Sequence, residues 1–320
     1  MSATAASATP AKPIAASVEA RERRGVALMV AGGLLLGTIG VFVQEAGQHP
    51  LTTVWFRCVF GGVALLLWGA ATGRLGELRL RGKALAAALA AGVLMIANWA
   101  LFFAAIERTS IAVATVVFHV QPLWVLALGA WWLREPVTRR QLGAALLALA
   151  GLALATGLVD GAASAGSEMS SAYVMGLLMC LGGSLSYAAV TLIAKLARDS
   201  TSSFALAWWQ CAVGTVALGW WPAVHGWPPW GASWAWLAGL GVIHTGLAYV
   251  VLYAGMARLS TSRIALLQFV YPAAAVVVDW VVYGRALSVV QVGGVALMAV
   301  ALLATRRADT ARELEPRILD

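Results

Sequence analysis

Charged residues are scarce in this chain: only 11% of its 320 residues are Asp, Glu, Lys or Arg, whereas 61% are hydrophobic. About a quarter of the residues of a soluble globular domain are charged, so this composition argues against one. The mean hydropathy of +0.82 agrees with that conclusion. We therefore expect an all-α integral membrane protein, because its apolar runs have the length of membrane-spanning helices.

Cysteine is also scarce, with only Cys58, Cys180 and Cys211. Each lies in an apolar segment, and an odd number without metal-ligand spacing argues against a disulfide framework and a zinc site. The sequence also lacks the GxxxxGK[ST], GxSxG and HExxH patterns. We therefore expect no ATP-hydrolysing domain, no catalytic residues, no metal and no cofactor.

An internal repeat is the main feature that is present. Residues 103–152 recur as residues 253–302 at a constant offset of 150, without a gap. Pro122 falls on Pro272 at this offset, and earlier segments keep it too. One offset that holds over so much of the chain indicates a duplication.

Ten apolar windows of spanning length divide evenly between the two copies. The expected domains are a disordered cytoplasmic tail (1–25), a first five-helix repeat (26–158), a second five-helix repeat (171–305) and a cytoplasmic tail (306–320). The expected spans are 26–44, 51–72, 83–106, 109–132, 138–158, 171–195, 202–222, 232–256, 260–284 and 287–305.

Basic residues indicate the orientation of these spans. All but three of the 22 Lys and Arg residues fall on one side, the exceptions being Arg57, Arg108 and Arg285. Because basic residues mark cytoplasmic loops, both termini are predicted to be cytoplasmic in a multi-pass protein of the cytoplasmic (inner) membrane. Five helices per repeat also force the second repeat to be inverted, an arrangement found in many secondary transporters. The net charge of +8 is therefore interpreted as topological, and no nucleic-acid partner is expected.

Three stretches carry a resemblance to a known family: PLTTVWFRCVFGGVALLLWG, FHVQPLW and LREPVTRRQLGAALLALAGLALA. They resemble the EamA-type drug/metabolite transporter superfamily, and within it the YddG-type exporters of aromatic and other amino acids. The resemblance implies ten helices in two five-helix halves and export of small metabolites. The second half departs from the LREP pattern, because Arg285 stands at the position equivalent to Glu135.

Two equivalent prolines, Pro122 and Pro272, fall inside the fourth and ninth predicted spans. Each removes a backbone donor and kinks its helix, which frees carbonyl groups in the membrane interior. We interpret them as hinges beside a substrate cavity. A packing kink is the alternative, since proline is frequent in membrane helices.

Deep polar side chains are the first candidates for substrate contact. A titratable or amide group inside the bilayer must face a partner or water. Hydrogen bonding to a neighbouring helix is the alternative for each. The candidates are His119, His244, Asn98, Gln268 and Gln210.

Aromatic residues near these positions complete the predicted substrate site. Trp99 and Tyr249 are equivalent at the offset of 150, and Tyr187 lies deep in the sixth span. A cavity edged by aromatic rings and a few polar groups suits a small amphipathic metabolite. Arg57 and Asp279 lie at similar depths below the outer surface, so we hypothesise that they form an ion pair or gate.

Together these features predict a secondary transporter that moves small metabolites by alternating access, and the family resemblance implies that amino acids foremost are moved out of the cell. Nucleotide sugars or drug-like cations are the alternative substrates, and a membrane enzyme using His119 and His244 is the alternative of another class. Of the 14 acids, all but Asp279 lie in tails, loops or helix ends, so no carboxylate offers a proton relay at mid-depth. Its partners are its substrate and the lipid bilayer, and the sequence leaves the oligomeric state, a monomer included, open.

Overall fold

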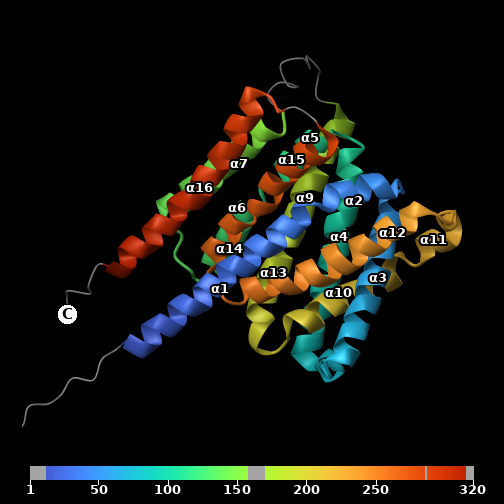
Figure 1. Cartoon of the computed structure of the whole chain (residues 1–320), viewed down its shortest axis with the longest axis horizontal. Helices are drawn as coiled ribbons and strands as arrows, with labels where there is room; N and C mark the ends of the chain where they lie inside the picture. Colours follow the sequence, from blue (N-terminus) through green and yellow to red (C-terminus); the bar gives the residue numbers. More distant parts are fainter. Residues whose placement is uncertain (1–11, 158–169, 285–286, 315–320) are drawn as a thin grey trace, which may run out of the picture.

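The computed structural model describes residues 12–157, 170–284 and 287–314 (Figure 1), and within these ranges every regular element is a helix. The first half contains α1 (Lys12–Gly37), α2 (Ile39–Ala46), α3 (Pro50–Ala71), η1 (Leu75–Leu78), α4 (Gly82–Ile106), α5 (Ile111–Phe118), α6 (Gln121–Trp132) and α7 (Arg139–Ala155). The second contains α9 (Ser171–Leu196), η2 (Ala197–Asp199), α10 (Ser203–Leu218), α11 (Trp220–His225), α12 (Ala232–Gly239), η3 (Leu240–Leu247), α13 (Ala248–Met256), α14 (Thr261–Leu267), α15 (Val270–Tyr283) and α16 (Val289–Leu314).

Seven of the ten predicted spans coincide with helices that are long and apolar enough to cross a membrane. The tenth coincides with a shorter apolar stretch, Val289–Leu303. The fifth and seventh coincide with α7 and α10, which have 17 and 16 residues. At 1.5 Å per residue these two helices are roughly 25 Å long, a little less than the hydrocarbon thickness.

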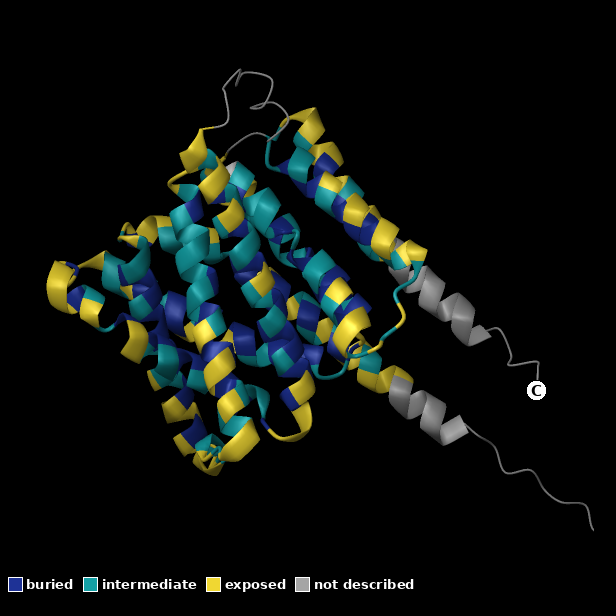
Figure 2. Cartoon of the chain, turned by 180° about the vertical axis from the view of Figure 1, so that it is seen from behind, coloured by how far each residue is buried: buried dark blue, intermediate teal, exposed yellow. Residues whose placement is uncertain are grey.

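The outer faces of these helices are apolar, as a membrane protein requires. Leu67 is 67% exposed, Trp131 80% and Val216 83%. Buried residues gather in the interior of the bundle, and exposed ones lie on its outward faces (Figure 2). Large exposed apolar side chains in such number indicate contact with lipid.

Helices that are equivalent at the offset of 150 pack against each other in opposite directions. In one pair, Trp55 of α3 donates to Thr215 O of α10 at 3.0 Å, while Gly69, farther along α3, faces the earlier residue Phe204. Chain direction is therefore antiparallel between α3 and α10. Opposite directions for equivalent helices are what an inverted repeat requires.

The second such pair, α7 and α16, lies along one edge of the bundle (Figure 1). Gly151 approaches Gly294 so closely that an added Cβ would lie 2.7 Å from Gly294 O. Farther along α7, Ala155 O accepts from the earlier residue Gln291 at 3.3 Å, so these helices are also antiparallel. Small residues allow this close backbone approach within one chain.

The fourth and ninth predicted spans are each broken in the middle. α5 ends at Phe118 and α6 begins at Gln121, just before Pro122. α14 ends at Leu267 and α15 begins at Val270, two residues before Pro272. Proline cannot donate to the preceding turn, and each break lies within the turn N-terminal to it.

The expected disordered tail over residues 1–25 needs a correction. Residues 1–11 lie outside the described ranges, but α1 already begins at Lys12. Glu22 of this helix accepts from Arg263 Nη1 at 2.8 Å, which ties its first turns to α14. A tail rich in Ala, Ser and Thr that ends in RERR suggested disorder, whereas residues 12–25 are helical and gain this partner from the other half. At the other end, α16 continues through residue 305 to Leu314.

Candidate functional site

The two helix breaks are joined by a hydrogen bond between glutamines. Gln121, the first residue of α6, donates from Nε2 to Gln268 Oε1 at 2.8 Å. Gln268, in the break between α14 and α15, donates in turn to Thr191 Oγ1 of α9 at 3.3 Å. Gln121 is only 2% exposed. Breaks from both halves therefore meet at one buried polar point.

His119 lies in the first break and faces aromatic residues from the second. Its Nδ1 donates to Thr115 O of the preceding turn at 2.6 Å, and the same carbonyl also accepts from the His119 backbone N–H at 3.1 Å. Its ring centroid lies 5.8 Å from that of Tyr271 and 6.4 Å from that of Phe269. The sequence placed His119 at the site but gave no sign of these two ring contacts.

Arg57 brings a positive charge into the interior. It is 4% exposed, its Nε donates to Thr245 Oγ1 at 2.9 Å, and its guanidinium carbon lies 4.4 Å from the centre of the Trp99 ring. Its Nη2 has no hydrogen-bond partner. A buried guanidinium nitrogen without a partner is costly, and an anionic group of a ligand would satisfy it.

The hypothesised ion pair between Arg57 and Asp279 is not among the ion pairs of the described residues, because Arg57 turns toward Thr245 and Trp99 instead. Equal depth in two helices is required for such a pair, but depth alone does not determine which side chains face each other.

Aromatic rings connect Arg57 with the breaks. Trp99 lies 6.4 Å from Tyr249 between ring centroids, and Tyr187 lies 6.3 Å from Phe118 at the end of α5. Trp99, Tyr187 and Tyr249 belong to one hydrophobic cluster. The three predicted aromatic residues are thus brought together, and the interior between the halves is edged by rings.

Two of the predicted amides lie in interhelical bonds. Asn98 donates from Nδ2 to Gly183 O of α9 at 2.9 Å, and Gln210 accepts from the Tyr253 hydroxyl at 2.6 Å. Asn98 therefore joins the packing of α4 on α9, which is the alternative that the sequence left open. Gln210 keeps an unpartnered Nε2.

His244 lies apart from His119. It belongs to η3, a π-helical stretch, and its Nε2 is 2.8 Å from the Thr38 hydroxyl in the turn between α1 and α2. Since that hydroxyl already donates to Leu35 O, Nε2 of His244 is the donor and its Nδ1 is left without a partner. The two histidines contact different elements, so they do not form one catalytic pair.

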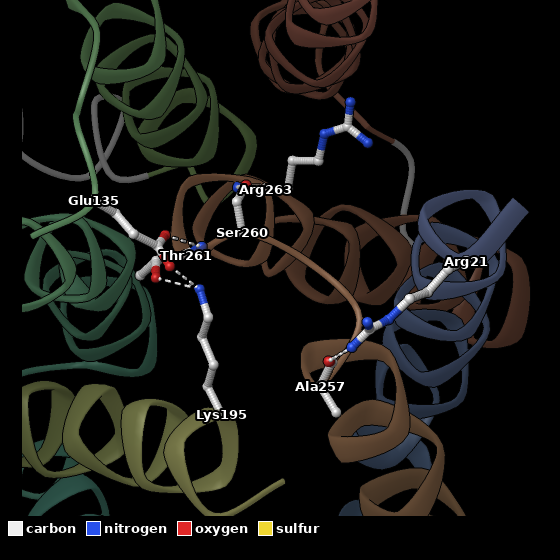
Figure 3. A network of polar contacts seen from close by, with 7 residues as sticks. All are labelled: Arg21, Glu135, Lys195, Ala257, Ser260, Thr261 and Arg263. Carbon is white, nitrogen blue, oxygen red and sulfur yellow. Dashed lines mark hydrogen bonds and ion pairs between the residues drawn. The ribbon is translucent and has the colours of Figure 1, made fainter. Parts of the chain in front are cut away.

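Sequence reasoning did not assign a role to the interaction that ties the halves together at one end of the bundle (Figure 3). Glu135, between α6 and α7, accepts from Lys195 Nζ of α9 and, at 2.8 Å, from Thr261 N at the start of α14. Lys195 also donates to Thr261 Oγ1 at 2.9 Å. We call Glu135, Lys195 and Thr261 the interhalf lock. Arg285, the residue equivalent to Glu135, lies outside the described residues.

Burial alone would raise the pKa of the Glu135 carboxyl, but the hydrogen bonds from Lys195 and Thr261 outweigh it and hold this pKa below its ordinary value. The carboxylate is therefore charged at neutral pH, and the lock is intact there.

Comparison with protein-family models identifies the family of this chain. The model of the EamA-like transporter family matches residues 23–157 and also residues 174–307, which together are most of the chain. The chain belongs to this family. Both helix breaks lie inside the matched segments, one in each.

Similar proteins occur in a bacterium and an archaeon. An uncharacterized transporter of Bacillus subtilis, YxxF, is 27% identical over 288 residues, which cover 87% of this chain and 89% of the relative. An uncharacterized transporter of Archaeoglobus fulgidus is 28% identical over 285 residues, covering 89% and 97%. A solved crystal structure shares the fold with a TM-score of 0.77 at 18% identity, covering 89% of this chain and 98% of its own. The chain is therefore a membrane transporter by family.

Proposed function

We propose that this EamA-like protein is a secondary transporter that exports amino acids, aromatic ones included, by alternating access across the cytoplasmic membrane. Equivalent helices that run antiparallel support two inverted five-helix repeats, and with α7, α10 and α16 counted as spans the chain crosses the bilayer ten times. An even number of crossings places both termini on one side, and the basic residues make that side the cytoplasm. The resemblance to YddG-type exporters adds the outward direction.

The observation that carries this proposal is that the two broken helices meet in the interior, where one aromatic cluster extends from the second break to Trp99, the ring on which the buried Arg57 lies. Gln121 and Gln268 offer amide groups, the aromatic rings offer apolar surface, and Arg57 offers an unpartnered Nη2. A carboxylate satisfies Arg57, and an apolar side chain packs on the rings. The same positive charge disfavours a cationic drug, which would bury two like charges together.

Flux into proteoliposomes tests the substrate. Vesicles that contain only this protein are given radiolabelled aromatic and aliphatic amino acids, a nucleotide sugar and a lipophilic cation. Saturable counterflow of an amino acid, absent from protein-free vesicles, is expected. Counterflow of the nucleotide sugar or the cation alone would overturn the amino-acid assignment, and chemical conversion of a probe without flux would favour an enzyme.

Cysteine labelling tests the orientation. The three native cysteines are buried, so their background reaction with an impermeant maleimide should be low. In whole cells, Trp230→Cys, on the loop before α12, should react from outside, whereas Arg79→Cys, after η1, should react only after lysis. Reaction of both positions from outside would contradict the inverted arrangement.

A further inference from the structure

A cavity of about 600 Å³ lies at the end of the bundle that carries most basic residues, among α1, η2, α10 and α13. Four arginines line it: Arg21, Arg74, Arg198 and Arg258. It is distinct from the site between the helix breaks, because its lining includes neither glutamine of that site.

Two of the four arginines are neutralised by neighbours. Arg74 forms a bidentate pair with Glu77, at 2.5 and 2.9 Å, and the hydrogen bond to Arg74 holds the pKa of Glu77 below its ordinary value. Arg198 lies 3.5 Å from the carboxylate of Asp199, the acid that lines the cavity. Four positive and two negative charges leave two positive charges in excess.

The excess belongs to Arg21 and Arg258. Among the described residues neither forms an ion pair: Arg21 donates to Ala257 O at 3.2 Å (Figure 3), and Arg258 donates to Ala254 O. Burial, and then the nearby charges of Arg24 and Arg21, lower the pKa of Arg258 below its ordinary value. Like charges held together without an acid are unfavourable until an anion joins them.

Two further donors face the same space. Thr201 lines the cavity, is 7% exposed, and its hydroxyl has no hydrogen-bond partner. Ser203 also lines the cavity at the first residue of α10, a helix of 16 residues whose N-terminus carries partial positive charge. The arginines could be at this end only because basic residues are enriched in cytoplasmic loops. Thr201 is uncharged, so its buried, unpartnered hydroxyl is independent evidence for a ligand.

We propose that this cavity binds a phosphate group through Arg21, Arg258, Thr201 and the N-terminus of α10. A phosphate group, which carries one negative charge as a diester and up to two as a monoester, offers several oxygens to the two guanidinium groups without an ion pair and to the α10 N-terminus. Phe204 and Val250 give the cavity an apolar wall, so the phosphate has room for an apolar body beside it. Such a ligand is either the headgroup of an anionic lipid or a free phosphate ester.

Two binding experiments distinguish the sources. The purified full-length protein in detergent is titrated with inorganic phosphate against sodium chloride of equal ionic strength, and thermal unfolding is recorded. The same protein is reconstituted into nanodiscs of phosphatidylcholine, with or without phosphatidylglycerol, and retained lipid is counted by native mass spectrometry. Each experiment is repeated with Arg21→Gln plus Arg258→Gln, and with the exposed Arg21→Gln alone.

A matched control removes the same charge from the same end of the bundle. Arg139 and Arg140, both exposed at the start of α7, are outside the cavity, and Arg139→Gln plus Arg140→Gln should leave binding unchanged. Loss of one charge-assisted hydrogen bond should weaken binding about tenfold in Arg21→Gln, and the double variant should lose it. If the double variant does not fold, the single variant still decides.

Saturable stabilisation by phosphate that only the cavity variants weaken identifies a soluble phosphate ester as the ligand class. Selective retention of phosphatidylglycerol that only the cavity variants weaken identifies a lipid headgroup. No binding of either probe, or equal loss in the control variant, overturns the proposal. Flux through the proposed transport site is a separate measurement, so failure here leaves that function intact.

Discussion

The two helix breaks keep the same proline but differ at the polar and aromatic positions around it. Phe118, His119 and Gln121 surround the first break, and the equivalent positions in the second hold Gln268, Phe269 and Tyr271. Where one half places a glutamine, the other places an aromatic residue. Duplication thus preserved the proline and the broken helix, while the groups available to a ligand diverged. We infer that a substrate binds in one orientation rather than in two equivalent ones.

A second difference lies beside the breaks. α4 of the first half is a regular helix, whereas its counterpart is divided into α12, the π-helical η3 and α13. The wider turn allows Thr245 to donate to Leu240 O five residues earlier, at 3.0 Å, while it accepts from Arg57. π-helical turns are frequent at functional sites. The second half therefore supplies the partner for a charge of the first.

The interhalf lock should show the largest effect. Glu135→Ala leaves Lys195, whose side chain is 10% exposed, without its acid, and the second half has no acid at the equivalent position to replace it. Removing one member of a buried pair costs about 3 kcal/mol or more, reduced here because the Glu135 side chain is 29% exposed. A lower thermal unfolding temperature of the purified protein and slower flux are expected.

Controls separate the lock from a general loss of charge. Asp199→Asn removes an acid that is 87% exposed and should change stability little. Exchange of the pair, Glu135→Lys with Lys195→Glu, should recover part of the loss, although the bond to Thr261 N is not restored. Because the pKa of Glu135 is lowered, the lock stabilises the fold above the ordinary carboxyl pKa, and this stabilisation is lost as pH falls through the lower folded value. A stability profile that falls between pH 8 and pH 6 for reasons traced to Glu135 would contradict this assignment.

Arg57 should show the next largest effect, on transport rather than stability. Its equivalent position holds Ala207, so the second half offers no replacement charge. Arg57→Gln should reduce amino-acid flux more than tenfold, since a charge-assisted bond contributes about 1.5 to 3 kcal/mol. Arg57→Lys keeps the charge but loses the planar group over Trp99, and an intermediate rate is expected. Thr245→Val, which removes the structural partner alone, is the control, and an equal loss there would mean that Arg57 acts only in packing.

The sequence predicted the parts of this fold that depend on periodic patterns. Spacing and apolar length located the helices, and the offset of 150 located both breaks, because proline acts on its own backbone. Contacts across the bundle were harder to predict from the sequence. In the interhalf lock, Glu135 bonds Lys195, 60 positions away, and Thr261, 126 positions away. The sequence predicted a pair between Arg57 and Asp279 from their similar depth. The rotation of each helix about its axis, which the sequence does not give, instead directs Arg57 to Thr245.

The glutamine pair should show a smaller effect. Gln121→Leu and Gln268→Leu each break the bond between the two halves, and a neutral hydrogen bond contributes about 1 kcal/mol. A double-mutant cycle in thermal or denaturant unfolding should give a coupling energy of that size. Additive single effects would show that the two breaks are not coupled through these side chains.

The histidines should show the smallest effect. His119 caps α5 within its own half, and His244 holds the turn between α1 and α2, so neither is placed to pass a proton to the other. With no acid at mid-depth in the sequence, counterflow of labelled substrate should proceed without a pH gradient, and His119→Gln with His244→Gln should change its rate less than about twofold at any pH from 6 to 8. Each ring can be replaced by glutamine, which keeps one donor for Thr115 O or Thr38 Oγ1. Strong uphill accumulation driven by an imposed pH gradient, lost in His119→Gln alone, would instead show that the first half carries a proton and the second does not.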